Sequence, residues 1–570
     1  MRILFLTHSF NSLTQRLYVD LAERGHDISI EFDINDAVTV EAVRQFQPHL
    51  IIAPYLRRAI PEAIWRNHLC LVVHPGIVGD RGPSALDWAI LNGVPEWGVT
   101  VLQANDEMDA GPVWASVNFR MREARKSSLY RNEVTEAAVT AVLRAIERFE
   151  QGNFTPSLPS AGTRGQWRPL MTQSDRQIDW LVDDTQTVLR KINSGDGSPG
   201  VADMLDGELC HLYDACEEDS LRGKAGEIIA RRHGAICRAT RDGAVWIGHL
   251  KRIIPGEKTF KLPATVVLNR TLENVPEASL SLNASRNSKT YKEIWYEEKG
   301  AAGYLHFDFY NGAMSTEQCQ RLLEAYKQIR QRPTRVIVLM GGQDFWSNGI
   351  HLNRIEAADS PADESWCNIN AMDDLVQAII TTDTHLTIAA LRGNAGAGGA
   401  FLALAADRIF ARAGVVLNPH YKNMGNLYGS EYWTYLLPKR VGERGRAIME
   451  NRLPLGAAEA KRLGLIDECF GEDTDNFVAS MESMVATLAS DASYETQLEA
   501  KCQQRKQDEA DKPLAHYRTE ELERMKLNFY GFDPSYHVAR YNFVFRVSNS
   551  WTPLHLARHR RVSQKIAATV

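Results

Sequence analysis

The chain has 570 residues, a net charge of −6, 44% hydrophobic residues and 24% charged residues. This composition is typical of a folded globular protein with an ample core, and the length predicts about three or four domains. The acidic balance gives no electrostatic reason to expect a nucleic-acid partner. No apolar stretch reaches membrane-spanning length, so we expect no membrane association, and the apolar run at residues 3–6 is too short for a signal peptide.

The eight cysteines show no CxxC spacing. The sequence therefore predicts neither a metal site nor a disulfide framework. Free thiols are typical of a reducing compartment, so we expect a cytoplasmic protein.

The first 115 residues alternate short β-branched runs with helical stretches. Strands are predicted at 2–7, 28–32, 49–55, 70–74 and 98–103, and helices at 12–24, 40–46 and 83–92. This rhythm predicts a doubly wound parallel sheet that is covered on both faces. The first strand leads into HSFNS instead of GxGxxG, which excludes the usual phosphate turn of a nicotinamide-binding domain.

A candidate site follows two of these strands. Strand 70–74 ends in His74, where ligands gather in a parallel sheet, and strand 98–103 leads into the acidic loop that holds Asp106, Glu107 and Asp109. A histidine beside a carboxylate is held in one tautomer, and its charged form is stabilised. The alternative is a strand-end histidine with a structural hydrogen bond, beside a solvated acidic turn.

Segments 74–93 (HPGIVGDRGPSALDWAILNG) and 98–112 (GVTVLQANDEMDAGP) resemble the 10-formyltetrahydrofolate formyltransferases, including the methionyl-tRNA type. Segments 171–180 and 224–229 are similar to their C-terminal β-barrel region. The resemblance covers about residues 1–260 and implies that His74 and Asp109 are catalytic. It also implies folate contacts at Gly76, Ser84 and Asp106. Val72 replaces the asparagine that the family carries two residues before the histidine, so another group must supply that polar contribution.

A second candidate site comes from glycines that directly follow β-rich runs. They lie in the loop 341–352 and in the stretch 391–407, after the runs 336–340 and 387–391. Glycines let the chain turn sharply and aim amide groups at a ligand, and a helix starting near Gly398 adds its positive end. Two such amides suit the oxyanion of a reacting thioester. The alternative is a pair of ordinary strand-to-helix turns.

These stretches resemble the crotonase (enoyl-CoA hydratase/isomerase) superfamily from about residue 291 to 478, including the capping box Ser315–Gln318. The resemblance implies a coenzyme A thioester whose carbonyl accepts from the amides of Ile350 and Gly398. The coenzyme A contacts are expected at Gly349, Gly399 and Tyr421.

The two glutamates of the hydratases are replaced here by Phe401 and His420, so water addition to a double bond is not expected. Segment 419–442 offers His420, Tyr428 and Glu431 as catalytic groups, because a polar group in an apolar run needs a partner. The alternative is that its aromatic side chains form core.

We therefore expect an α/β multidomain protein. Its predicted parts are a formyltransferase catalytic domain at 1–165, a small OB-like β-barrel at 166–275, a crotonase-like spiral domain at 276–490 and a helical extension at 491–570.

This fusion resembles the HypX/HoxX-type hydrogenase maturation family. The resemblance implies formyl transfer from 10-formyltetrahydrofolate to coenzyme A, then decarbonylation of formyl-CoA to carbon monoxide, with a [NiFe]-hydrogenase maturation complex as partner. Two alternatives stay open. One is a formyltransferase acting on another amine or aminoacyl acceptor, with a passenger crotonase domain. The other is a non-catalytic scaffold that binds folate or coenzyme A.

Overall fold

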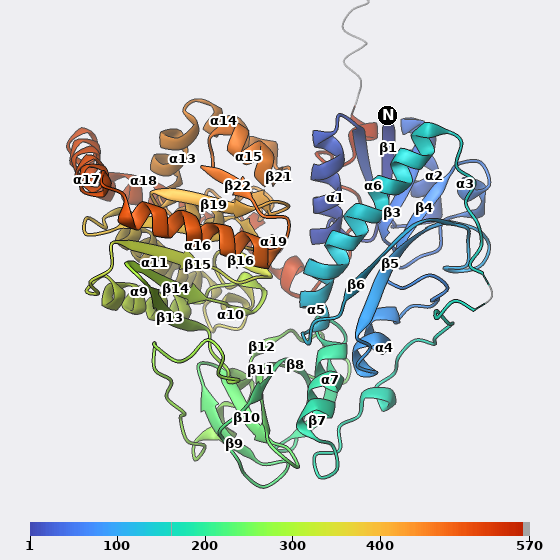
Figure 1. Ribbon diagram of the computed structural model, residues 1–570, viewed down its shortest axis with the longest axis horizontal. Coiled ribbons are helices and arrows are strands. Elements are labelled where there is room, and N and C mark those ends of the chain that lie inside the picture. Colours follow the sequence, from blue (N-terminus) through green and yellow to red (C-terminus); the bar gives the residue numbers. More distant parts are fainter. Residues whose placement is uncertain (161, 562–570) are drawn as a thin grey trace, which may run out of the picture.

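The computed structural model describes residues 1–160 and 162–561, which form three lobes (Figure 1). The N-terminal lobe and the large lobe of the C-terminal half lie side by side, and the small middle lobe lies below both. The predicted boundaries after residues 165, 275 and 490 stay a prediction.

The N-terminal lobe is built on a six-stranded sheet of order β2-β1-β3-β4-β5-β6. Its strands are β1 (Arg2–Thr7), β2 (Asp27–Phe32), β3 (Leu50–Tyr55), β4 (Cys70–His74), β5 (Glu96–Gln103) and β6 (Val113–Arg120). Its helices are α1 (Ser12–Glu23), α2 (Asp36–Phe46), α3 (Glu62–Trp65), α4 (Ala85–Leu91), α5 (Lys126–Leu129), the π-helical turn η1 (Tyr130–Val134) and α6 (Thr135–Gln151).

The expectation of an all-parallel sheet is wrong for its last two strands. Strands β1 to β4 are parallel, but β5 is antiparallel to β4 and to β6. The segment 104–112 between β5 and β6 is too short for the crossover that parallel pairing requires. Because β5 also runs antiparallel to β4, the end of β5 lies beside the start of β4, where Gln103 pairs with Leu71.

The middle lobe is an open sheet of order β7-β8-β11-β10-β9, with β12 on β11, instead of the expected closed barrel. The edge of β9 is satisfied without closure, because the backbone of Arg231 exchanges hydrogen bonds of 2.9 Å with Pro276 and Ala278 of the following linker. Its elements are η2 (Ser174–Arg176), α7 (Thr185–Gly195), β7 (Val201–Leu205), β8 (Glu208–Glu218), β9 (Ile228–Arg232), β10 (Ala235–Ala239), β11 (Ala244–Arg252), β12 (Leu262–Pro263), α8 (Ala264–Val267) and η3 (Asn269–Leu272).

The large lobe holds two sheets, of orders β13-β14-β15-β17-β19-β22 and β16-β18-β20-β21. The strands are β13 (Ile294–Lys299), β14 (Ala302–Phe307), β15 (Val336–Met340), β16 (Phe345–Ser347), β17 (Leu386–Leu391), β18 (Asn394–Gly396), β19 (Arg408–Arg412), β20 (Val416–Asn418), β21 (Leu455–Gly456) and β22 (Glu468–Phe470). The helices are η4 (Tyr310–Gly312), α9 (Thr316–Ile329), α10 (Leu352–Glu356), α11 (Pro361–Ile380), α12 (Gly398–Leu404), α13 (Trp433–Val441), α14 (Arg444–Asn451), α15 (Ala457–Leu463) and α16 (Thr474–Ser490). The predicted capping box opens α9 and is confirmed.

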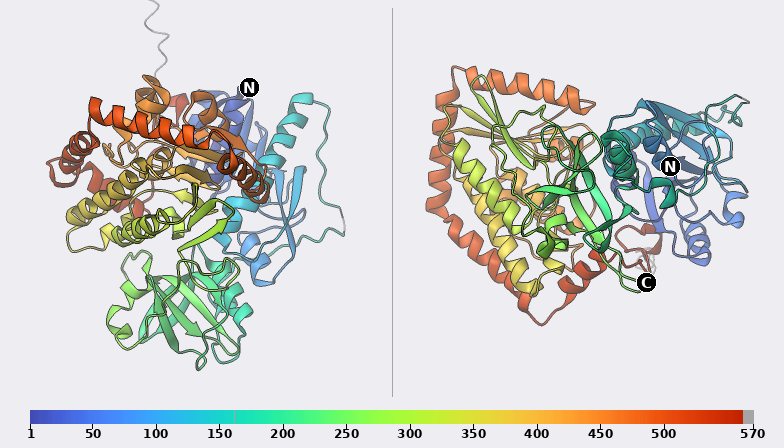
Figure 2. Two further views of the ribbon diagram at one scale, coloured as in Figure 1. Left: turned by 60° about the vertical axis from the view of Figure 1, so that its left-hand side comes forward. Right: turned by 90° about the horizontal axis from the view of Figure 1, so that it is seen from below.

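The C-terminal helices α17 (Tyr494–Asp511), α18 (Leu514–Tyr530) and α19 (Ser535–Val544) wrap the large lobe, and η5 (Arg558–Arg560) follows (Figure 2). Leu522, Met525 and Phe529 of α18 lie in the main core of this lobe. The chain then returns to the N-terminal lobe, where buried Glu31 binds His559 at 2.9 Å and Arg560 at 2.7 Å. The C-terminal extension thus contacts both the large lobe and the N-terminal lobe.

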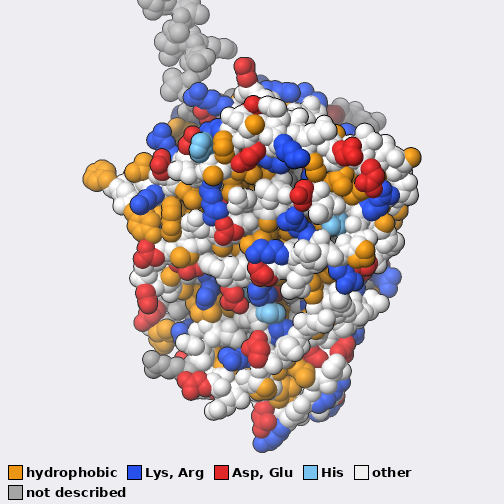
Figure 3. All heavy atoms as spheres, turned by 90° about the vertical axis from the view of Figure 1, so that its left-hand side faces the viewer, with side chains coloured by type: hydrophobic (Ala, Val, Ile, Leu, Met, Phe, Trp, Pro, Cys, Tyr) orange, Lys and Arg blue, Asp and Glu red, His pale blue; other side chains and the backbone are white. Residues whose placement is uncertain are grey.

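Charges of both signs are interspersed over the face that carries α17, with apolar side chains between them (Figure 3). Among the described residues, no helix combines the length and apolarity that a membrane crossing requires.

Candidate active sites

The first site is centred on His74, which ends β4 and is only 4% exposed. Its Nε2 lies 3.1 Å from Asp80 Oδ1, and its Nδ1 lies 3.4 Å from Asp109 Oδ2. Asp80 is within hydrogen-bond distance of one ring nitrogen, and Asp109 faces the other. Two flanking carboxylates therefore suit a histidine that accepts and returns a proton during a reaction.

Asp109 reaches this histidine by an unexpected route. Because β5 is antiparallel, the acidic loop leaves the sheet beside Cys70, where the Ala104 amide donates to the Cys70 carbonyl at 2.8 Å. The loop then folds back along the sheet, with Asp109 in the left-handed region at φ 54°. Asp109 Oδ2 also lies 3.3 Å from the Gly82 amide that donates to it. The predicted proximity of His74 and Asp109 is confirmed although the predicted direction of β5 was wrong, and their catalytic role stays a prediction.

The three residues expected to contact folate lie in different surroundings. A Cβ atom on Gly76 would lie 2.3 Å from His74 Nε2, so only glycine allows the ring this position. Ser84 precedes α4, and its hydroxyl accepts from the Met171 amide at 3.1 Å. Asp106 is exposed. Only Gly76 is thus brought against His74, and the folate contacts stay predictions.

Sequence reasoning missed Asp80, which is 2% exposed and lies 3.8 Å from Arg168 Nε through its Oδ2. The only available signal was an acid in the loop that follows His74. Val72, at the position of the family asparagine, packs in an apolar cluster. Asp80 is therefore a second polar partner of the histidine, beside Asp109.

The second site begins with two amides. Gly349 has a φ of 78°, and a Cβ atom on it would lie 3.2 Å from the Gly398 nitrogen, so the two glycine turns touch. Among the described residues, no protein acceptor is found for the amide of Ile350 or of Gly398. The backbone at Gly399 lies close to Ser347, because a Cβ atom on Gly399 would lie 2.1 Å from the Ser347 carbonyl oxygen. Two adjacent free amides are the arrangement that binds an oxyanion.

The Glu431 carboxyl lies directly beside this amide pair. A Cβ atom on Gly398 would lie 2.0 Å from Glu431 Oε1. The Tyr421 hydroxyl donates to Glu431 Oε2 at 2.5 Å, and the Phe401 ring stacks on the Tyr421 ring with centroids 5.3 Å apart. Phe401, which replaces a hydratase glutamate, thus supports the tyrosine that holds Glu431.

Burial raises the pKa of Glu431 to about 8, and the nearby Asp373 and Glu521 act in the same direction. Burial, followed by the neighbouring Glu431, raises the pKa of the Tyr421 hydroxyl well above its ordinary value. Glu431 can therefore take and release a proton near neutral pH, as a general base must.

The backbone at Glu431 is strained. Glu431 and Tyr432 have φ values of 60° and 57°, a left-handed conformation that costs a side-chain-bearing residue about 1–2 kcal/mol each. Such strain persists only where the surroundings hold it, and it is common at functional sites.

The other expected groups are not hydrogen-bonded to Glu431. His420 is buried, both of its ring nitrogens lack partners among the described residues, and burial lowers its pKa to about 4. Tyr428 is half-buried against Trp433, with ring centroids 5.4 Å apart. No hydrogen bond within the described part of the chain joins either residue to Glu431, so Tyr421 is its direct partner.

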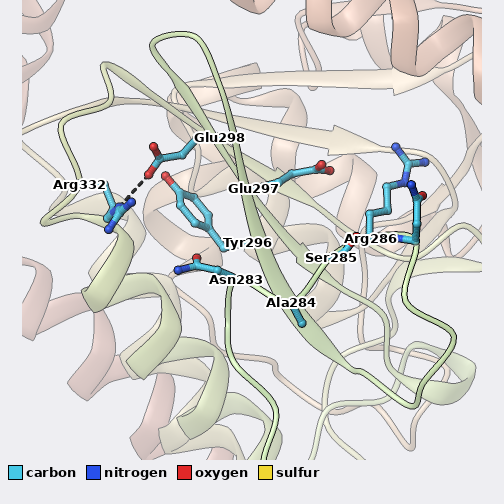
Figure 4. Close-up of a pocket in the computed structure, with 9 residues that line it drawn as sticks. Asn283, Ala284, Ser285, Arg286, Tyr296, Glu297, Glu298 and Arg332 are labelled. Carbon is cyan, nitrogen blue, oxygen red and sulfur yellow. Dashed lines mark hydrogen bonds and ion pairs between the residues drawn. The ribbon is translucent and has the colours of Figure 1, made fainter. Parts of the chain in front are cut away.

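A surface hollow of about 480 Å³ lies elsewhere, between the linker 283–287 and β13 (Figure 4). Tyr296, Glu298 and Arg332 border it, and Arg332 donates to Glu298 at 2.7 Å. None of its lining residues belongs to either site.

Family models match three parts of the chain. They are formyl transferase at residues 31–146, the formyl transferase C-terminal domain at 170–263, and enoyl-CoA hydratase/isomerase at 308–529. The hydrogenase maturation factor HoxX of Bradyrhizobium diazoefficiens is 56% identical over 98% of this chain and 97% of its own length. The chain belongs to the HoxX/HypX family of hydrogenase maturation factors.

Some relatives match the whole chain, and others match only the formyltransferase part. HypX from Aquifex aeolicus, solved in complex with tetrahydrofolic acid, superposes with a TM-score of 0.96 at 51% identity over 99% of each chain. Methionyl-tRNA formyltransferase of Thermotoga neapolitana is 26% identical over 40% of this chain and 72% of its own. The predicted formyltransferase and crotonase-like parts are confirmed.

Proposed function

We propose that the protein makes carbon monoxide for a [NiFe] hydrogenase in two steps. Formyl moves from 10-formyltetrahydrofolate to coenzyme A, and formyl-CoA is then decarbonylated. The observation that carries the proposal is Glu431 beside two free amides in a chain that also holds a His74–carboxylate site. The names of its relatives, which mention tetrahydrofolic acid and hydrogenase maturation, support the folate substrate and a hydrogenase maturation complex as partner.

In the first step, the coenzyme A thiolate attacks the formyl carbon. The carbon–sulfur bond forms, the bond to the folate nitrogen breaks, and that nitrogen receives the proton lost by the thiol. His74 donates to the developing oxyanion or to the departing nitrogen, while Asp80 and Asp109 stabilise its charged form. Such assistance contributes on the order of 10²-fold or more in rate.

The N-terminal lobe touches the large lobe next to the amide pair, which supports passage of the thioester within one molecule. Asn418, at the end of β20, donates through its side chain to Gln15 of α1 at 3.0 Å. Its carbonyl accepts from the Ala397 amide at 2.9 Å, directly before the Gly398 turn. One residue thus links the helix that follows β1 to the amide pair, and a protected route keeps formyl-CoA from water.

In the second step, the amides of Ile350 and Gly398 hold the thioester oxygen. The Glu431 carboxylate takes the formyl proton, the carbon–sulfur electrons leave with sulfur, and carbon monoxide forms. Glu431 then returns the proton to the thiolate. The Glu431 pKa of about 8 is close to the roughly 8.5 of a thiol, so the free-energy change of this proton transfer is small. Phe401 stands where the hydratases carry one of their two glutamates, so this proposal includes no addition of water.

The test combines the full chain with 10-formyltetrahydrofolate and coenzyme A. We expect tetrahydrofolate to appear only when coenzyme A is present, and carbon monoxide to be trapped by deoxyhaemoglobin. Tetrahydrofolate formed without coenzyme A would indicate another acceptor. Formyl-CoA that accumulates without carbon monoxide would make the crotonase part a passenger, and absence of turnover would indicate a scaffold.

We also propose a cytoplasmic location. All eight cysteines are free thiols, which is typical of a reducing compartment.

A further inference from the structure

The turn that carries Glu431 is held by a carboxyl from the C-terminal extension. Glu521 of α18 is fully buried, and its Oε2 accepts from the Tyr432 amide at 2.9 Å. Its Oε1 accepts from the amide and hydroxyl of Thr434 at 2.8 and 2.5 Å. Glu521 therefore fixes the backbone immediately after Glu431.

A second carboxyl, from helix α11, holds the same turn. Asp373 of α11 is also fully buried, and its Oδ1 accepts from the Glu431 amide at 2.8 Å. Its Oδ2 accepts from the Ser430 hydroxyl at 2.8 Å, and that hydroxyl lies 3.4 Å from Glu521 Oε2. Asp373 and Glu521 thus accept hydrogen bonds from residues on both sides of the turn, in which Glu431 and Tyr432 are left-handed.

The ionisable groups that face this cluster come from several elements. They are Tyr421 before the turn, Tyr432 within it, Asp373 and Asp374 of α11, Glu521 and Arg518 of α18, and Cys319 of α9. Arg518 Nε lies 3.8 Å from Asp373 Oδ2. Like charges in a buried cluster oppose ionisation of one another.

We propose that Asp373 and Glu521 are positioning residues that hold the Glu431 carboxyl beside the amide pair and tune its affinity for a proton. This inference rests on the proposed decarbonylation. It gives α18, a helix of the C-terminal extension, a role in that reaction. Burial raises the pKa of Asp373 to about 7 and that of Glu521 to about 8, and neighbouring carboxylates act in the same direction.

The test uses Asp373→Asn and Glu521→Gln, with Glu520→Gln as the matched control. Glu520 is the neighbouring residue on α18, is exposed, and pairs with Lys512 at the surface. For each variant, kcat and KM for carbon monoxide release from formyl-CoA are measured across neutral and alkaline pH. In addition, the infrared band of the protonated Glu431 carboxyl, identified by its loss in Glu431→Gln, is titrated without substrate.

We expect the wild-type rate to rise with pH around the Glu431 pKa, since the ionised form is the base. In Asp373→Asn, loss of the like charge moves this midpoint and the infrared titration to lower pH by on the order of one unit. In Glu521→Gln, kcat falls about tenfold or more while KM is unchanged, because the base is misplaced. Glu520→Gln behaves as the wild type.

An unchanged midpoint in Asp373→Asn, or a Glu521→Gln variant with the kinetics of the control, would overturn the inference. Folding of each variant is checked by circular dichroism and by its retained formyl transfer activity. If Asp373→Asn does not fold, the infrared titration of Glu521→Gln, which also removes a like charge, carries the same test. A wild type that releases no carbon monoxide contradicts the proposed function instead, while the infrared titration still decides whether the two acids tune Glu431.

Discussion

Replacing Glu431 with glutamine tests the base of the second step. Glu431→Gln keeps the shape of the side chain and leaves an amide oxygen to accept from the Tyr421 hydroxyl, now at 2.5 Å from Oε2. It removes the group that takes the formyl proton. A positioned base contributes about 10²- to 10⁴-fold, which corresponds to roughly 3–5 kcal/mol of the barrier. We expect carbon monoxide release from supplied formyl-CoA to fall by that factor.

The assay gives formyl-CoA directly to the enzyme and traps carbon monoxide with deoxyhaemoglobin. Formation of tetrahydrofolate from 10-formyltetrahydrofolate and coenzyme A is measured in parallel and should be unchanged. Glu450→Gln, on the exposed face of α14, is the control. Carbon monoxide release by Glu431→Gln at the wild-type rate would refute the assignment of the base.

Four further outcomes are expected. Tyr421→Phe removes the hydrogen bond to Glu431 and should slow carbon monoxide release about 10- to 100-fold; an unchanged rate contradicts the pairing. His74→Ala should lower tetrahydrofolate formation about 10²-fold or more, yet leave carbon monoxide release from formyl-CoA intact; loss of both activities would contradict separate sites. Gly76→Ala should impair the same first activity, because its Cβ would lie 2.3 Å from His74 Nε2, and a fully active variant would show that the ring can move. The pKa of Glu431 is raised from 4.5 to about 8, so the stability from its protonated form is complete below pH 4.5 and is lost as the pH rises through about 8. Above that pH, thermal melts should show Glu431→Gln to be more stable than the wild type; equal melting temperatures would contradict burial of the charge.

The local elements were predictable because their signals are local. Strands 2–7 and 70–74 agree with β1 and β4, and the glycine run predicted the helix that begins at Gly398. Helix α2 begins earlier than expected, because Asn35 caps it through a bond from the Val38 amide. Strand direction and barrel closure depend on pairing between distant segments, and those expectations needed correction.

The same distinction holds for the sites. Glu431 was predictable as a polar residue in an apolar run, and the amide pair from glycines after strands. Asp373 and Glu521 come from helices that are remote in sequence, and nothing in their local pattern points to the turn that they hold. Asp80 likewise acts through a loop conformation that spacing does not encode.

The most direct test of the account follows one carbon atom through the full chain. 10-Formyltetrahydrofolate labelled with ¹³C in the formyl group is incubated with the protein and unlabelled coenzyme A, and the trapped carbon monoxide is analysed for the label. We expect labelled carbon monoxide that requires coenzyme A and falls by about 10²-fold or more in either His74→Ala or Glu431→Gln. Labelled carbon monoxide formed without coenzyme A, or labelled formate as the sole product of the wild type, would contradict it.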